Sequence, residues 1–332
     1  MSSNYSIEII PAAAICETIA GTPALIIDTT GSDHMASVIG KLYSPGQYKT
    51  YFTRPGINQL AKTIELANSL GIKTVVLCGE HLPRLKDIFG EKEYSAALIS
   101  AGSPISSKDT LLRHILKDPL AVEFAHIAYQ NYRYSPKDMH LLRERNFEEI
   151  RLGVLRDDNT LCEPTLRTKD LIFIDLNAVR CSDFPNNTTF SPNGLYAEEI
   201  CQIARYAGMG QKVKNIYVYG YPSTLEPNPI AAELIAEVFW HIAEALSSSV
   251  DEDPGNSAME EMFLRKIVSM GEEGQDIVFV TSCSSGRWWM EVSEVKTTNI
   301  QYIPCSYQDY LTACSGEIPL RWLFFFQKIN RI

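Results

Sequence analysis

The sequence predicts an α/β fold with three layers, in which helices cover both faces of a mostly parallel sheet of roughly eight strands. Short, mostly apolar runs recur along the chain, and segments with helical periodicity separate them. Apolar runs without polar alternation are typical of strands buried on both faces, and strands that alternate with helices form βαβ units. The runs that we expect to be strands are residues 24–28, 74–78, 96–100, 124–129, 150–155, 171–176 and 216–219.

Two amphipathic segments are the clearest helices outside the centre of the chain. Residues 57–70 follow Pro55-Gly56, carry apolar residues three and four positions apart, and end at Gly71. Residues 230–246 form a second, longer apolar segment. We expect both to pack against the sheet.

One stretch, residues 170–208, combines a strand, a polar loop and a helix, and we expect it to organise the functional site. The apolar strand is interrupted by Asp175 near its C-terminal end, the edge at which open α/β sheets carry their chemistry. A loop rich in Asn, Ser, Thr and Pro follows. The helix then has Glu198 and Glu199 in its first turn and Gly208 at its end.

Changes in composition divide the chain into three parts. Residues 1–246 form the predicted α/β domain, residues 247–257 an exposed acidic linker or mobile loop, and residues 258–332 a C-terminal appendage. In the appendage, residues 276–282 and 288–292 flank a Gly-containing turn and predict a hairpin. Its aromatic tail predicts docking on the main domain or on a partner subunit.

Charge and composition exclude several functions. The chain has 40 acidic and 30 basic residues, a net charge of −10, which argues against nucleic acid or an anionic membrane as a partner. No run of eighteen apolar residues and no secretory signal is present, so we expect a cytoplasmic protein. Nucleophile-elbow, phosphate-loop and dinucleotide-binding motifs are missing.

The stretch 170–208 resembles the arginase superfamily, which includes arginase, agmatinase and formimidoylglutamase. There a buried strand ends in Asp-x-Asp, a loop carries Pro and Gly, and a helix opens with Gly-Leu and an acid. The matching features here are Asp175-Leu176-Asn177, the run SPNGL at residues 191–195, and Glu199. The resemblance is to a divergent, formimidoylglutamase-like branch, and it implies the arginase-like fold for residues 1–246 and a homo-oligomer.

The resemblance also implies where two Mn²⁺ ions would be held, at the ends of three strands. The run VLCGEH at residues 76–81 resembles the first place and leaves His81 in a ligand position, although Gly31-Ser32-Asp33-His34 offers an alternative register. The second place has Ser100, Gly102 and Pro104 in the positions where the family has Asp, His and Asp. The third keeps Asp175 but replaces its partner with Asn177.

These substitutions predict that the metal site is degenerate. Too few carboxylates and imidazoles remain to offset the charge of two dications in a partly desolvated pocket. Gly220 follows the strand at 216–219, where the resemblance implies a Glu that contacts the substrate's cationic group. We therefore expect no catalytic residue, no resident cofactor, and a pseudoenzyme that acts in binding, scaffolding or regulation.

One alternative function stays open, and so does the identity of any partner. A working C–N hydrolase of linear amidines or guanidines could use a single metal or a rearranged site with His81, Asp175, Asn177 and either Glu80 or Asp183. A small molecule in the vacated pocket, a protein partner, or a second copy of the chain would each fit a non-catalytic role.

Overall fold

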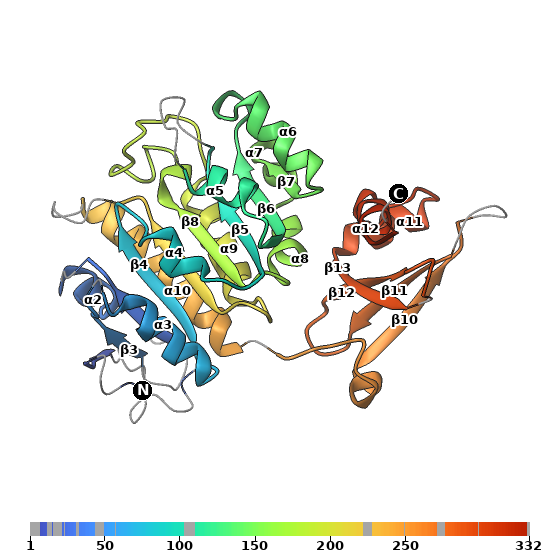
Figure 1. Cartoon of the computed structure of the whole chain (residues 1–332), viewed down its shortest axis with the longest axis horizontal. Helices are drawn as coiled ribbons and strands as arrows, with labels where there is room; N and C mark the ends of the chain where they lie inside the picture. Colours follow the sequence, from blue (N-terminus) through green and yellow to red (C-terminus); the bar gives the residue numbers. More distant parts are fainter. Residues whose placement is uncertain are drawn as a thin grey trace.

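The computed structural model describes a three-layer α/β/α unit followed by a smaller antiparallel sheet (Figure 1). The described residues are 7–11, 15, 22, 24–30, 33–43, 50–56, 58–102, 110–221, 228–248, 250–270, 276–297 and 299–330.

Nine described strands form the large sheet, in the order β1-β3-β2-β4-β9-β8-β5-β6-β7, and every pairing is parallel. The central strands are apolar and buried because helices cover both faces. The strands are β1 (Ile7–Ile9), β2 (Ala24–Asp28), β3 (Thr50–Thr53), β4 (Lys73–Gly79), β5 (Tyr94–Ile99), β6 (Ala121–Tyr129), β7 (Glu148–Arg151), β8 (Leu171–Asp175) and β9 (Asn215–Tyr219).

Two groups of helices bury the faces of this sheet. The helices α2, α7, α8, α9 and α10 pack on one face, and α3, α4, α5 and α6 on the other. Their bounds are α2 (Asp33–Ile39), α3 (Leu60–Ser69), α4 (Leu85–Phe89), α5 (Leu111–Lys117), α6 (Pro136–Glu144), α7 (Leu152–Asp157), α8 (Cys162–Leu166), α9 (Ala197–Gly208) and α10 (Pro229–Ser248), with 3₁₀ turns η2 (Asn131–Arg133), η3 (Asn159–Leu161) and η4 (Leu176–Ala178).

The predicted three-layer fold is confirmed, but two details of the sheet differ. Two of its nine described strands, the short strands β1 and β3, lie outside the seven runs expected to be strands. The strand predicted at 150–155 overlaps β7 at residues 150–151 and is wrong beyond them, since the chain turns into α7 at Leu152. Leu152 and Leu155 are both buried, and their spacing of three residues is helical.

The segment around residues 170–208 folds as predicted, into strand β8, a loop and helix α9. The backbone N–H of Tyr196 donates to the Glu199 carboxylate (2.8 Å), which satisfies a donor at the start of α9. Gly208 is the last residue of α9, and a Cβ there would lie 2.5 Å from the carbonyl oxygen of Ile242 on α10. This glycine therefore permits two helices to pack closely.

The C-terminal part contains a four-stranded antiparallel sheet in the order β10-β11-β12-β13. The predicted hairpin is present, with Phe279 opposite Met290. Two helices bury one face of the sheet through Trp322, Phe325 and Ala313. The elements are η5 (Ser257–Met262), β10 (Phe263–Val268), β11 (Ile277–Ser282), β12 (Trp288–Ser293), β13 (Ile300–Cys305), α11 (Tyr307–Cys314) and α12 (Leu320–Asn330).

The C-terminal part lies on the side of the large domain that carries α8 (Figure 1). Buried charged groups join the two parts. Arg167 donates to the carbonyl of Trp288 (2.9 Å), and its guanidinium lies 4.6 Å from the centre of the Trp289 ring. Arg287 donates to the carbonyl of Met209 (2.9 Å). The domain boundaries themselves stay a prediction.

The expectation that residues 247–257 are exposed is wrong for Glu252, which is only 3% exposed. Its carboxylate accepts hydrogen bonds from the hydroxyls of Ser282, Ser284 and Ser285 and lies 3.7 Å from Arg287. The acidic composition misled the prediction because one acid of the run is used to fix the hairpin. None of the described helices has the length and continuous apolar character that crossing a bilayer requires.

Candidate functional site

A pocket of about 560 Å³ lies at the C-terminal ends of β4, β9, β8 and β5, which are neighbours in the sheet. Parallel strands bring their C-terminal ends to one edge, so residues far apart in sequence meet there. Of the predicted site residues, His81, Ser100, Gly102, Asp175 and Asn177 line this pocket. Pro104 lies outside the described residues, and so do the first two residues of the alternative register, 31–32.

Asp175 lies half-buried at the end of β8 and is bound by its own loop. Its Oδ1 accepts hydrogen bonds from the backbone N–H of Asn177 (2.9 Å) and from Nδ2 of Asn177 (3.1 Å). Desolvation raises the pKa of Asp175 to about 6, and the two hydrogen bonds from Asn177 oppose this rise. The Asp175 carboxyl is therefore easier to protonate than an ordinary aspartic acid.

Asn177 is oriented by three hydrogen bonds that occupy both ends of its amide. Its Nδ2 donates to Asp175, while its Oδ1 accepts from the backbone N–H (2.8 Å) and the hydroxyl (2.9 Å) of Thr188. The side-chain oxygen, the only atom of this amide that could ligate a cation, is thus turned toward Thr188. Asn177 is therefore part of a hydrogen-bond network that holds the loop.

Asn187 completes this network, and sequence reasoning missed its role. It is 1% exposed, and its Nδ2 donates to the carbonyls of Asn177 (3.1 Å) and Val179 (2.6 Å). Its Oδ1 accepts from the backbone N–H and the hydroxyl of Thr189. The only signal in the sequence is the run Asn-Asn-Thr-Thr at residues 186–189, which includes Asn187 and is typical of polar turns.

Gly220 follows β9 and packs directly against the floor of the pocket. Its φ is +87°, in the left-handed region, and a Cβ there would lie 2.4 Å from Oδ1 of Asp175 and 2.6 Å from Nδ2 of Asn177. The position therefore has no room for the glutamate that the resemblance implied.

Ser100 is the one hydroxyl of the predicted positions, and it pairs with a buried histidine. Its Oγ lies 2.9 Å from Nε2 of His126, and His126 is fully buried on β6. Burial lowers the pKa of His126 to about 3, so the imidazole is a weak general base at neutral pH. Its Nδ1 has no hydrogen-bond partner within the described part of the chain. The described residues therefore disfavour a Ser-His catalytic pair, because none of them besides Ser100 is hydrogen-bonded to the imidazole.

His81 and Asp183 do not complete a metal site with Asp175. The His81 side chain is 84% exposed in the turn after β4, and its Nε2 lies 3.9 Å from the Glu80 carboxylate. Asp183 accepts from Arg180 (2.7 Å) and does not line the pocket, whereas Glu80 does.

The described donors at this sheet edge do not fit a pair of Mn²⁺ ions. Among the described residues, no three His, Cys, Asp or Glu side chains are grouped so that they could hold a metal ion. The Oδ1 of Asp175 accepts from the Asn177 amide, and the Oδ1 of Asn177 accepts from Thr188. What remains is a polar pocket to which Thr188 and Tyr219 also contribute, two residues that sequence reasoning did not select.

No known family profile and no curated protein sequence matches this chain. Solved structures do match in shape. A formimidoylglutamase from Bacillus subtilis superimposes with a TM-score of 0.62 at 12% identity, over 75% of this chain and 93% of that chain.

Two trypanosomal proteins match at similar levels. The Mn²⁺-containing formiminoglutamase of Trypanosoma cruzi gives a TM-score of 0.58 at 14% identity, over 72% of this chain and 99% of that chain. A quadruple mutant of an arginase-like protein from T. brucei gives a TM-score of 0.54 at 14% identity, over 71% of this chain and 94% of that chain. Together with the parallel sheet and its two helical layers, these similarities show that the chain has an arginase/ureohydrolase-like fold.

Proposed function

We propose that this chain is an arginase-fold protein without ureohydrolase activity, which acts in binding, scaffolding or regulation. One observation carries the proposal: the Asp175 and Asn177 side chains at the sheet edge are hydrogen-bonded to each other. A dinuclear metal site needs several carboxylates aimed at the ions, because bound dications are otherwise uncompensated in a desolvated pocket. The described donors do not provide them.

Metal analysis combined with activity assays tests this proposal. The protein is purified from Mn²⁺-supplemented cells, and its Mn²⁺ content is measured together with urea, ammonia and formamide release from arginine, agmatine and formimidoylglutamate. We expect substoichiometric metal and no turnover above the level of an Asp175→Ala variant. Tightly bound stoichiometric Mn²⁺ with turnover that Asp175→Ala abolishes would establish instead the alternative function, a C–N hydrolase with a single or rearranged metal site.

A second candidate function is small-molecule sensing by the same pocket. Its volume of about 560 Å³ is suited to a small metabolite, and Glu80, Ser100, Asp175 and Thr188 offer polar contacts. A ligand that binds the folded state raises the melting temperature by mass action. We expect an amino acid or guanidino compound to stabilise the wild-type protein and not a Ser100→Trp variant, which would fill the pocket. Equal melting temperatures with and without such compounds favour the scaffold.

A further inference from the structure

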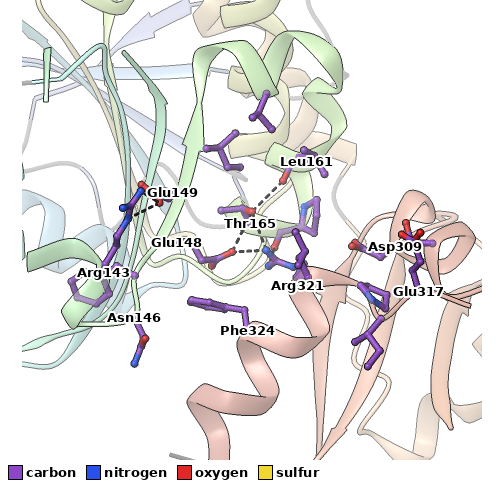
Figure 2. Close-up of a pocket in the computed structure, with 18 residues that line it drawn as sticks. Arg143, Asn146, Glu148, Glu149, Leu161, Thr165, Asp309, Glu317, Arg321 and Phe324 are labelled. Atoms are coloured by element: carbon purple, nitrogen blue, oxygen red, sulfur yellow. Dashed lines mark hydrogen bonds and ion pairs between the residues drawn. The ribbon is translucent and has the colours of Figure 1, made fainter. Parts of the chain in front are cut away.

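A second and larger cavity, of about 920 Å³, lies where the C-terminal helices meet the large domain (Figure 2). One wall comes from the end of α6, the turn before β7, β7 itself and α7, η3 and α8. The other wall comes from α11, the turn after it and α12. This cavity is separate from the pocket of about 560 Å³ at the strand ends, the strand-edge pocket, because the two share no lining residue. The proposed function concerns the strand-edge pocket alone.

The cavity walls are mainly apolar, and several of the side chains remain in contact with water. Leu320 is 82% exposed, Ile318 48% and Val154 36%. A cavity of this size and character is in the range of sites that take the apolar body of a small ligand. The apolar lining residues are Phe147, Ile150, Val154, Leu161, Pro164, Ile318, Pro319, Leu320 and Phe324.

The two arginines of the lining are already neutralised. Arg143 lies 3.0 Å from the Glu149 carboxylate, and Arg321 forms an ion pair with Glu148 (Figure 2). Arg321 also donates to the carbonyl of Pro304 (2.7 Å). These contacts leave little free cationic charge for an anionic ligand.

The lining also has acidic charge that no described basic residue neutralises. Glu317 is exposed and lines the cavity, and its carboxylate makes no hydrogen bond or ion pair with another described residue. Asp309 also lines the cavity and uses its Oδ2 to accept from the backbone N–H and hydroxyl of Ser306 (2.8 Å each). The net charge of the lining therefore favours a cation.

We propose that this cavity binds an amphiphilic cation, a molecule with an alkyl or aryl body and an ammonium-type head group. The body packs between Phe147, Val154 and Leu320, and the head group lies at Glu317. Because the lining comes from both parts of the chain, a bound ligand stabilises the docking of the C-terminal helices on the large domain.

Calorimetric titration of the full chain with decylamine, below its micelle concentration, tests the proposal. Decanol and decanoate carry the same alkyl body with a neutral and an anionic head group. We expect saturable one-to-one binding in which decylamine binds tighter than decanol, and decanol tighter than decanoate. Equal or tighter binding of decanoate, or no saturable binding of decylamine, overturns the proposal.

Two substitutions assign the binding to this cavity. Glu317→Gln should weaken decylamine binding about two- to fivefold, as expected for one exposed charge pair, and leave decanol binding unchanged. Val154→Trp, at a half-exposed position that tolerates a larger side chain, should weaken both. Glu93→Gln removes an exposed charge outside the cavity and is the matched control. If Glu317→Gln behaves like Glu93→Gln, or Val154→Trp binds normally, the ligand site is elsewhere and the proposal is wrong.

Discussion

Gly220 lies so close to Asp175 that a Cβ atom at Gly220 would be 2.4 Å from the Oδ1 atom of Asp175. Asp175 ends β8 and lines the pocket at this sheet edge, and Gly220 directly follows the neighbouring strand β9. A side chain that reaches from position 220 into the pocket is therefore incompatible with the present position of Asp175.

Gly220→Ala should be strongly destabilising. The substitution adds left-handed backbone strain of about 1–2 kcal/mol and a steric overlap that costs about 1–3 kcal/mol more. Gly71→Ala is the matched control, because Gly71 also has a positive φ (+73°) but has open space around its Cβ position. Urea unfolding should show a clearly larger loss in the free energy of unfolding for Gly220→Ala than for Gly71→Ala. Equal losses for the two variants would mean that the contact with Asp175 relaxes at no cost.

Asn177→Asp should lower stability at pH 7. The change removes the Nδ2 donor and places two carboxylates in contact, which costs about 1–3 kcal/mol. Because the pKa of Asp175 is raised to about 6, protonation near pH 5 should reduce the loss. Chemical unfolding at pH 7 and pH 5 measures the loss in the free energy of unfolding. Asn146→Asp, on an exposed turn, is the control. A loss that is the same at both pH values would contradict carboxylate repulsion.

Arg321→Met should destabilise the docking of α12. The side chains of Arg321 and Glu148 are only 16% and 11% exposed, so removal of the arginine leaves a largely desolvated carboxylate without its partner. This should lower the free energy of unfolding by about 3 kcal/mol. Lys169, 3.4 Å from Glu148, limits the loss. A double-mutant cycle with Glu148→Gln should give a coupling of at least about 1 kcal/mol.

The control for that cycle is the exposed ion pair between Arg84 and Asp87, at 2.9 Å. Arg84 is 57% exposed, and Arg84→Met should change the free energy of unfolding by no more than about 0.5 kcal/mol. A coupling energy between Arg321 and Glu148 no larger than this would indicate that the ion pair does not hold the helix.

His126 should make stability fall as the pH falls below about 6.5. Burial lowers the pKa of His126 to about 3 in the folded state, so the unfolded state binds more protons between the two pKa values. Stability is therefore complete above the unfolded pKa and declines with acidification, by up to about 1.4 kcal/mol per pH unit. Unfolding of wild type and His126→Phe between pH 7.5 and 5 measures this slope. His140→Phe is the control, since its side chain is 79% exposed; an unchanged slope in His126→Phe would exclude His126 as the source.

The sequence predicted the central elements well and failed where local signals conflicted. The runs at 24–28 and 216–219 became strands because continuous apolar residues suit a sheet buried on both faces. The run at 150–155 has similar composition, yet Leu152 and Leu155 belong to a helix. Composition alone cannot distinguish a short buried helix from a short buried strand. Glu252 is acidic and lies in a polar run, and only the position of the serine-rich hairpin explains its burial.

By itself the sequence determined the layer architecture and the chemistry available at the strand ends, because apolar periodicity fixes which faces are buried and residue identity fixes which groups can ligate. It placed His81, Ser100, Asp175 and Asn177 at a common edge, and they line one pocket. Only the tertiary structure decided how those groups are used. The Asn177 amide turns its oxygen to Thr188, and Gly220 approaches Asp175 closely, because contacts between separate strand ends and loops depend on packing across the whole sheet.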